Sequence, residues 1–180
     1  MALQYFFKKN KEEEMGKKLI IIAVILLTFC LTLGAQTWSA VGSSGSVADE
    51  DLHEFGIQGD ALYFNGDGTG LYAVYNVANI CGVNVHSNWS FLGLTFKCTT
   101  EDTFAAATLK RVNLSTGESE QLAYVTNREP VHFPEGDNWF QAAKSFNHQF
   151  NFQIYAYYII VEMLRVDPAE YVGVKAVSLF

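Results

Sequence analysis

Basic residues are scarce in this sequence, and their scarcity excludes several kinds of partner. The 180 residues include 12 lysines and arginines against 19 aspartates and glutamates. Five of the basic and three of the acidic residues lie in residues 1–35, so residues 36–180 carry 7 basic against 16 acidic residues, a net charge of −9. A nucleic-acid backbone or an anionic membrane surface attracts positive charge. We therefore expect neither as a partner.

Cysteine and histidine are also few, and their spacing argues against common catalytic and metal sites. The three cysteines form no CxxC motif, the usual signature of thiol redox catalysis and of structural zinc. His53-Glu54 begins like the zinc-protease motif HExxH, but Ile57 stands where the second histidine is needed. There is no GxSxG serine motif and no phosphate-binding glycine loop between a strand and a helix. We expect no cofactor.

One long apolar run lies near the N-terminus. Lys17-Lys18 precede the apolar residues 19–33, and the small residues Gly34-Ala35 follow them. These three features are typical of a secretory signal peptide. As a helix the run spans roughly 22 Å, short of the ~30 Å hydrocarbon core of a bilayer, which disfavours the alternative of a retained membrane anchor. The sequence predicts a signal peptide over 1–35, with Met15 as an alternative start, and a secreted or periplasmic protein without stable membrane insertion.

The rest of the chain has the composition of β-structure. Hydrophobic residues make up 49% of the sequence and aromatic residues 14%, enough to form a core. We expect a flexible lead-in over 36–48, with a short edge strand at Trp38 to Val41, followed by one domain over 49–180. Runs rich in aromatic and β-branched residues predict its strands. These runs are 62–64, 71–77, 89–96, 103–112, 121–126, 148–161 and 171–180, with a hairpin turn at 115–118.

The fold class follows from the number and spacing of these strands. Turn signals recur every ten to fifteen residues and helical periodicity is almost absent. The clearest alternation is at 148–155, where Phe150, Phe152 and Ile154 are expected to point to one face of a strand. We predict an all-β protein, an antiparallel β-sandwich of jelly-roll-like topology, with an immunoglobulin-like arrangement as the second choice.

The segment Asn65-Gly66-Asp67-Gly68-Thr69-Gly70 begins like a calcium loop. Asn65, Asp67 and Thr69 occupy ligand positions 1, 3 and 5, but Asn76 stands where the loop needs a bidentate glutamate. The flanking residues favour strands rather than helices, and the glycines suit a turn. We therefore predict a hairpin turn here and keep the three residues only as a weak calcium candidate.

Two cysteines remain once Cys30 leaves with the signal peptide. Cys81 and Cys98 in an exported chain predict one disulfide, closing sixteen intervening residues and worth roughly 3 kcal/mol. The bridge requires Cα atoms within about 7 Å, so residues 82–88 must cross over before the next strand begins.

The long irregular segment 127–147 holds the best candidate binding residues. Aromatic and polar side chains alternate there, as in surfaces that hold sugars between rings and hydrogen-bonding groups. The candidates are His132, Phe133, Glu135, Asp137, Asn138, Trp139 and Phe140. The alternative is that the aromatic residues anchor the loop to the core. Glu129, Glu135 and Asp137 also allow a carboxylate pair for glycoside hydrolysis, a property that depends on distances in space.

Three stretches carry a resemblance to known proteins. The segment Trp38 to Glu50, the later Val74-Tyr75-Asn76-Val77 and the strand-rich remainder resemble a loose group of small exported bacterial β-sandwich proteins with no assigned activity. Val74 departs from this pattern, in which arginine precedes Tyr-Asn-Val. The resemblance implies export and a β-sandwich and identifies no catalytic residue.

The sequence thus favours an exported, non-enzymatic protein that acts by binding, to carbohydrate or to a surface protein of a cell. One alternative is a structural or adhesive subunit that self-associates through an edge strand around Trp38. The other is a small hydrolase.

Overall fold

A computed structural model describes residues 37–48, 53–65, 67–78, 88–129, 131–132 and 139–180. The chain divides into two units, Met1–Gly34 and Ala35–Phe180, and the described residues all belong to the second. Within them, no helix has the length and apolar character needed to span a membrane. The predicted signal peptide lies outside the described residues, so it and export remain predictions.

Seven strands form the larger sheet, called sheet A below. Across it they follow the order β3-β4-β12-β6-β10-β9, and β1 pairs with the C-terminal half of β12. The strands are β1 (Trp38–Val41), β3 (Phe55–Gln58), β4 (Ala61–Phe64), β6 (Phe91–Cys98), β9 (Val131–His132), β10 (Phe140–Ser145) and β12 (Val172–Leu179).

Five strands form sheet B, in the order β2-β5-β11-β7-β8. They are β2 (Ser46–Val47), β5 (Gly70–Val77), β7 (Phe104–Asn113), β8 (Ser119–Thr126) and β11 (Tyr155–Leu164), and the 3-10 helix η1 (Gly42–Ser44) connects β1 to β2. The hairpin predicted at 115–118 is confirmed: Gly117 has φ +74° and donates its N–H to Asn113 O at 2.8 Å. A positive φ is one that glycine adopts without strain.

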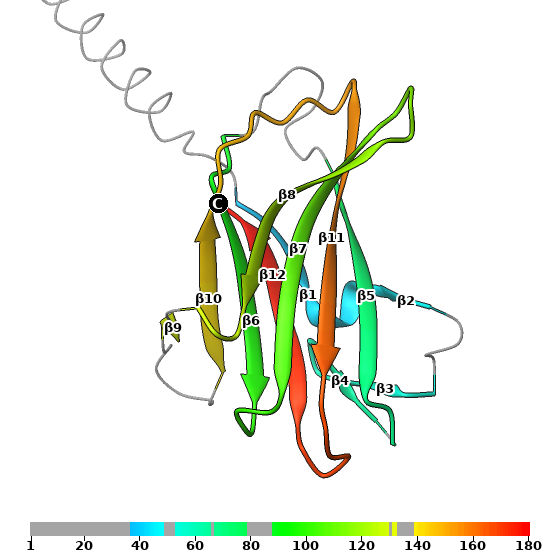
Figure 1. The fold of residues 1–180 in the computed structure, drawn as a ribbon, viewed down its shortest axis with the longest axis vertical. Coiled ribbons are helices and arrows are strands. Elements are labelled where there is room, and N and C mark those ends of the chain that lie inside the picture. Colours follow the sequence, from blue (N-terminus) through cyan, green and yellow to red (C-terminus); the bar gives the residue numbers. More distant parts are fainter. Residues whose placement is uncertain (1–36, 49–52, 66, 79–87, 130, 133–138) are drawn as a thin grey trace, which may run out of the picture. The chain divides into compact units, whose positions relative to one another are not determined.

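The two sheets pack face to face, and every described strand pairing is antiparallel (Figure 1). The chain changes sheet at most of its connections: β1 to β2, β2 to β3, β4 to β5, β5 to β6, β6 to β7, β8 to β9, β10 to β11 and β11 to β12. This confirms the predicted antiparallel β-sandwich with jelly-roll-like topology.

One hydrophobic core fills the space between the sheets. Alternate residues of the central strands are fully buried, among them Leu92 and Leu94 of β6 and Ile159 and Val161 of β11. Burying each such side chain contributes roughly 1.5–3 kcal/mol of transfer free energy. The period-2 alternation that the sequence shows along these strands therefore decides which side of each sheet faces inward.

Residues 150–154 do not form the strand that their alternation predicted; β11 begins only at Tyr155. Asn151 ends the regularity, because its carbonyl accepts the N–H groups of Ile154 and Tyr155 and its side chain accepts that of Gln153 at 3.1 Å. Phe150 is buried, whereas Ile154 is 46% exposed. The aromatic side chains of this segment cover the core as part of a capped turn instead of forming one face of a strand.

The lead-in predicted as flexible over 36–48 also belongs to the sandwich over much of its length. The short strand predicted at Trp38 to Val41 is present as β1, pairing Trp38 with Leu179. Trp38 is only 6% exposed, so its burial holds this segment to the core. Self-association through the edge of this strand remains a prediction.

Candidate functional site

The outer surface of sheet A carries a row of residues that do not contribute to the core. Val172 and Val174 are fully buried, so Gly173 between them faces outward. Its partners across the sheet are Tyr63 of β4 and Lys97 of β6. Residues directly opposite each other in a sheet share one face. Tyr63 and Lys97 therefore lie on the outer surface with Gly173.

Two tyrosine rings lie over glycines on this surface. A Cβ at Gly56 would meet the Tyr63 ring at 2.6 Å, and a Cβ at Gly173 would meet the Tyr171 hydroxyl at 2.9 Å. The two rings stack with centroids 6.0 Å apart and an interplanar angle of 17°. Because the glycines have no side chain, the rings lie close to the backbone. Burial, with Tyr63 nearby, raises the pKa of Tyr171.

Trp139 and Phe140 lie in the sequence-predicted binding segment, and the structure separates their roles. Phe140 pairs with Phe96 in the β10–β6 ladder, and their rings pack 5.9 Å apart against the core. Trp139 is half-buried and lines a hollow on the outer surface of sheet A. Phe140 therefore anchors the segment to the core, while Trp139 is left accessible.

A β-bulge brings a cation to Trp139. The pairing of β12 with β6 shifts register between Val174 and Ala176, so Lys175 is the extra residue. Bulges change the direction of a side chain relative to a regular strand. The Lys175 amino group lies over the Trp139 ring, 5.8 Å from its centroid, and 3.9 Å from an Asp60 carboxylate oxygen.

These elements enclose a hollow of about 320 Å³, which is the candidate site. It is lined by Gln58, Asp60, Ala61, Lys97, Trp139 and Tyr171. The hollow thus combines two aromatic rings, an amide, a carboxylate and an ammonium group. Together these side chains both donate and accept hydrogen bonds beside apolar ring surface. That combination suits a neutral or charged polyhydroxyl ligand.

A second pair of aromatic rings lies at the other end of β12. Phe91 and Phe180 stack with centroids 5.6 Å apart and are 41% and 38% exposed. Gly93 lies beneath them, since a Cβ there would meet Phe180 Cε1 at 3.0 Å. Gly173 and Phe180 are seven residues apart, which corresponds to roughly 20 Å along a strand. Sheet A therefore has aromatic surface near both ends of β12.

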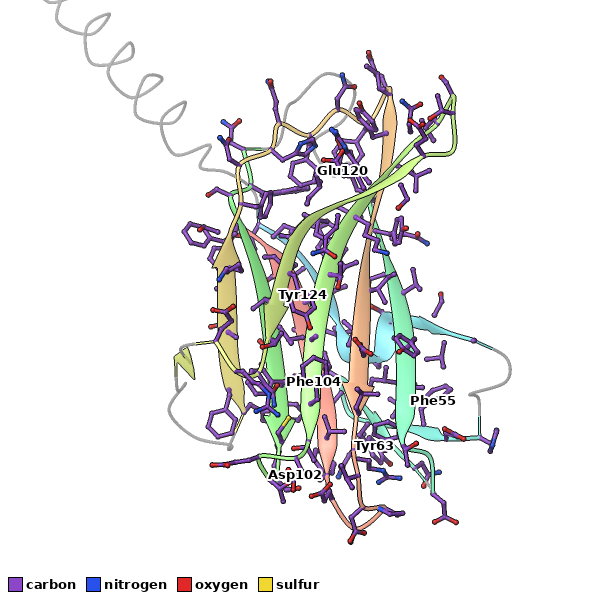
Figure 2. All side chains as sticks on the ribbon, viewed as in Figure 1. Phe55, Tyr63, Asp102, Phe104, Glu120 and Tyr124 are labelled. Atoms are coloured by element: carbon purple, nitrogen blue, oxygen red, sulfur yellow. The ribbon has the colours of Figure 1, made fainter. Side chains whose placement is uncertain are left out.

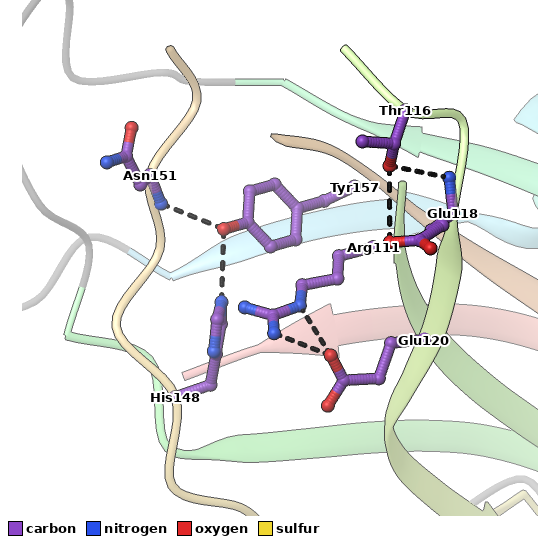
Figure 3. Close-up of polar contacts among 7 residues, drawn as sticks. All are labelled: Arg111, Thr116, Glu118, Glu120, His148, Asn151 and Tyr157. Atoms are coloured by element: carbon purple, nitrogen blue, oxygen red, sulfur yellow. Dashed lines mark hydrogen bonds and ion pairs between the residues drawn. The ribbon is translucent and has the colours of Figure 1, made fainter. Parts of the chain in front are cut away.

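A larger hollow, about 460 Å³, lies at the end of sheet B. Arg111 donates to a Glu120 carboxylate oxygen from Nε at 2.9 Å and lies over the Tyr155 ring, 4.3 Å from its centroid. In Figure 3 the Glu120 carboxylate faces the Arg111 guanidinium. Among the described residues that line this hollow, the one cation is therefore already paired with a carboxylate.

The Tyr157 hydroxyl, next to that hollow, lies 3.0 Å from His148 Nε2 and accepts the Asn151 N–H at 2.8 Å (Figure 3). Burial lowers the pKa of His148, and Arg111 lowers it further, while Glu120 acts in the opposite direction. These bonds tie the capped turn at 150–154 to β11. The contacts among Tyr157, His148 and Asn151 are therefore explained by their structural role in holding this turn.

A third hollow, about 640 Å³, contains Cys98. Two of its lining rings, Phe96 and Phe140, belong to the core packing described above. Cys98 carries a free thiol, whose pKa is raised by burial, and receives a long contact from Asn127 Nδ2 at 3.5 Å. The structure thus shows no bridge at Cys98. Cys81 lies outside the described residues, so the Cys81–Cys98 disulfide is a prediction that this structure does not support.

The other residues of the sequence-predicted site are only partly described. The backbone of His132 belongs to β9 and pairs with Gln141, whereas Phe133, Glu135, Asp137 and Asn138 lie outside the described residues. Of the carboxylates considered for hydrolysis, Glu129 accepts from Lys144 Nζ at 3.1 Å. The Glu129 carboxylate is thus engaged in an ion pair with Lys144, which accounts for its position without a catalytic role.

The glycine-rich segment after β4 is a turn, but its strands do not form a hairpin. β4 belongs to sheet A and β5 to sheet B, so the turn crosses between the layers. Arg165, only 6% exposed, donates from Nε to Gly68 O at 2.8 Å and from Nη1 to Pro168 O at 2.9 Å. A guanidinium therefore bonds to a carbonyl of the loop considered for calcium. Among the described residues, no group of three or more acidic, histidine or cysteine side chains is placed to hold a metal.

Sequence reasoning missed Gln58, Asp60, Lys97 and Tyr171 of the hollow. They come from the last residue of β3, from the β3–β4 turn, from β6 and from the residue before β12, and these segments are distant in the sequence. Only the strand register brings them together. The outward-facing glycines next to aromatic residues were the one available signal.

No family model and no curated protein sequence matches the chain. Among solved structures, it is similar to the CBM36-1 domain of a multidomain xylanase from the hindgut metagenome of Trinervitermes trinervoides, with 12% identity and a TM-score of 0.45 over 81% of this chain and 97% of that one. A low-affinity xylan-binding module, CBM86 of Roseburia intestinalis, gives 8% identity and a TM-score of 0.40 over 81% and 95% of the two chains. The K1 cleaved adhesin domain of Lys-gingipain from Porphyromonas gingivalis W83 gives 14% and 0.40 over 81% and 98%. At these identities and TM-scores, function does not transfer to this chain.

Proposed function

We propose that this protein is a non-enzymatic, carbohydrate-binding protein that acts outside the cytoplasm and holds its ligand on the outer surface of sheet A. The observation that carries the proposal is the hollow in which Trp139 and Tyr171 meet Gln58, Asp60 and Lys97. A sugar ring has an apolar face, which packs on an aromatic ring, and a rim of hydroxyls, which need both donors and acceptors. The lining of the hollow supplies aromatic rings, hydrogen-bond donors and hydrogen-bond acceptors.

The arrangement of rings suggests how a longer ligand lies. Trp139 and Tyr171 lie near one end of β12, and Phe91 and Phe180 lie near the other. Between them the outer surface carries the short polar side chains Thr95 and Ser178. We propose that an extended oligosaccharide lies along β12 and contacts rings at both ends.

Glycan binding by the purified protein and by two single-residue variants tests this proposal. Trp139→Ala removes one ring of the hollow and is expected to weaken binding at least tenfold, about 1.4 kcal/mol. The matched control is Tyr124→Ala, which removes an exposed tyrosine from β8 of sheet B (Figure 2). The control is expected to bind like the unmodified protein.

Two results would contradict the proposal. One is a protein that binds no glycan on a broad array. The other is a Trp139→Ala variant whose circular dichroism and glycan binding both match those of the unmodified protein.

A further inference from the structure

We infer that the hollow at Trp139 and Tyr171 prefers glycans that carry an acidic group, a carboxylate or a sulfate ester. This inference rests on the proposed function and adds a substrate class to it. It depends on the position and pairing of Lys97 and Lys175, which the sequence does not reveal.

The first observation is the local charge of the hollow. Lys97 lines it, with its amino group 5.6 Å from the centroid of the Tyr171 ring, and Lys175 lies over Trp139. Among the described residues, Asp60 is the acidic one that lines the hollow, and its carboxylate lies 3.9 Å from Lys175. Lys175 lies beside the hollow and does not line it. With Lys175 included, the described charged groups at and beside the hollow are two ammonium groups and one carboxylate, a net charge of +1, in a protein whose whole chain carries −7.

The second observation is that Lys97, unlike Lys175, forms no ion pair with a described acidic residue. Among the residues that the structure describes, no acidic side chain forms an ion pair with it. Its ammonium group therefore has donors free for a ligand. It also lies beside an aromatic ring on which a sugar ring packs, so an acidic substituent of that sugar lies within reach of the amino group.

Most other cations of the described chain are already engaged. Arg111 bonds Glu120, Lys144 bonds Glu129, and Arg165 and Arg128 donate to backbone carbonyls. Lys110 lies on β7 of sheet B, away from the hollow, and forms no ion pair with a described residue. An acidic ligand therefore finds a free ammonium group beside exposed rings at Lys97.

The chemistry does not distinguish a uronic acid from a sulfated sugar, because both present an anionic oxygen to an ammonium group. The experiment separates them with two matched pairs of ligands. The first pair is polygalacturonate and its fully methyl-esterified form. The second is a sulfated galactan and the same galactan after desulfation. Each pair keeps the sugar backbone and changes the charge.

The affinity of the full chain is measured for all four ligands. For each pair, the affinity for the acidic ligand is divided by the affinity for its uncharged counterpart. We expect this affinity ratio to be at least ten for one pair, and the pair that shows it identifies the acidic group as a carboxylate or a sulfate ester. Lys97→Gln is expected to bring that ratio close to one, and Lys97→Arg to restore it. Lys110→Gln removes the same charge from sheet B and is expected to keep the ratio. Circular dichroism and thermal melting establish that each variant is folded.

The outcomes separate this inference from the proposed function. Ratios near one in both pairs, with binding that Trp139→Ala weakens, would overturn the acidic preference and leave carbohydrate binding standing. A ratio that Lys97→Gln and Lys110→Gln reduce equally would also overturn it, because overall charge would then explain the preference. Absence of binding to all four ligands and to a broad glycan array would overturn both.

Discussion

The ring of Tyr171 lies over Gly173, with its hydroxyl oxygen 2.9 Å from the point that a side-chain Cβ would occupy. This is closer than real Cβ contacts allow, so a methyl group would displace the ring. The same ring lines the proposed binding hollow. The absence of a side chain at one strand position thus decides where a binding residue lies.

Gly173→Ala is therefore expected to weaken glycan binding several-fold, because Tyr171 must leave its position in the hollow. The nearest backbone atom, Leu62 O, lies at 3.2 Å, so we also expect a modest loss of stability. Gly70→Ala in sheet B is the matched control, since a Cβ there meets only Leu164 Cδ2 at 3.4 Å. Isothermal titration calorimetry measures both variants. Equal affinities for the two variants would contradict the role assigned to Gly173.

Phe91→Ala is expected to weaken the binding of long oligosaccharides and to leave that of short ones unchanged. The reason is distance, because only a ligand that extends roughly 20 Å from the Trp139 hollow reaches the Phe91–Phe180 pair. A series of oligosaccharides of increasing length, titrated against the variant and against Tyr124→Ala, measures the effect. A loss that is the same at every length would show that the two ring clusters are not parts of one surface.

Arg165→Met is expected to lower the free energy of unfolding by about 3 kcal/mol, because it leaves the buried Gly68 carbonyl and two part-buried hydrogen bonds without their donor. Arg165 donates to Gly68 O, Pro168 O and Glu170 O, at 2.8, 2.9 and 3.2 Å. Arg128→Met is the control. Arg128 is a surface residue that donates to Glu101 O, and its loss is expected to cost about 0.5 kcal/mol or less. Urea denaturation gives both values, and equal losses would contradict the prediction.

Stability is expected to fall as the pH drops below about 6.5, the ordinary pKa of histidine. Burial and the nearby Arg111 lower the pKa of His148 in the folded protein, against a smaller opposite effect of Glu120. The folded state therefore favours neutral His148. Its contribution is complete above the unfolded pKa and is lost as the pH falls toward the lower folded pKa.

The free energy of unfolding, measured between pH 7 and pH 5, is expected to decline less steeply in His148→Gln. His53→Gln provides the control, since the His53 side chain is 78% exposed. Identical slopes for His148→Gln and the unmodified protein would show that His148 does not contribute.

The strands were predictable from the sequence because their alternation reflects burial directly. Runs such as 71–77 and 103–112 correspond closely to β5 and β7. The alternation at 150–154 misled, because Asn151 forms a capped turn there and Phe150 packs on Trp89, with centroids 4.9 Å apart. Aromatic residues at alternate positions fit a strand, and they equally fit a turn that covers the end of a core.

The candidate site was predictable only in part. Trp139 was a candidate because its segment mixes aromatic and polar residues. The sequence alone could not show that Trp139 is accessible whereas Phe140 faces the core. Tyr171 and Lys97 were missed because nothing in their local sequence distinguishes them from other residues of β-strands. They become neighbours of Trp139 because β6 pairs with β12 on one side and with β10 on the other.

The sequence by itself determined the fold class, since alternating burial along short strands leaves few ways to cover apolar faces other than two stacked sheets. It also determined the small number of basic residues and the net negative charge, which argue against nucleic acid as a partner. Only the tertiary structure decided which side chains share the hollow and which lysine is unpaired. The physical reason is that hydrogen-bond register between strands distant in the chain brings these groups together, and register depends on the packing of the whole core.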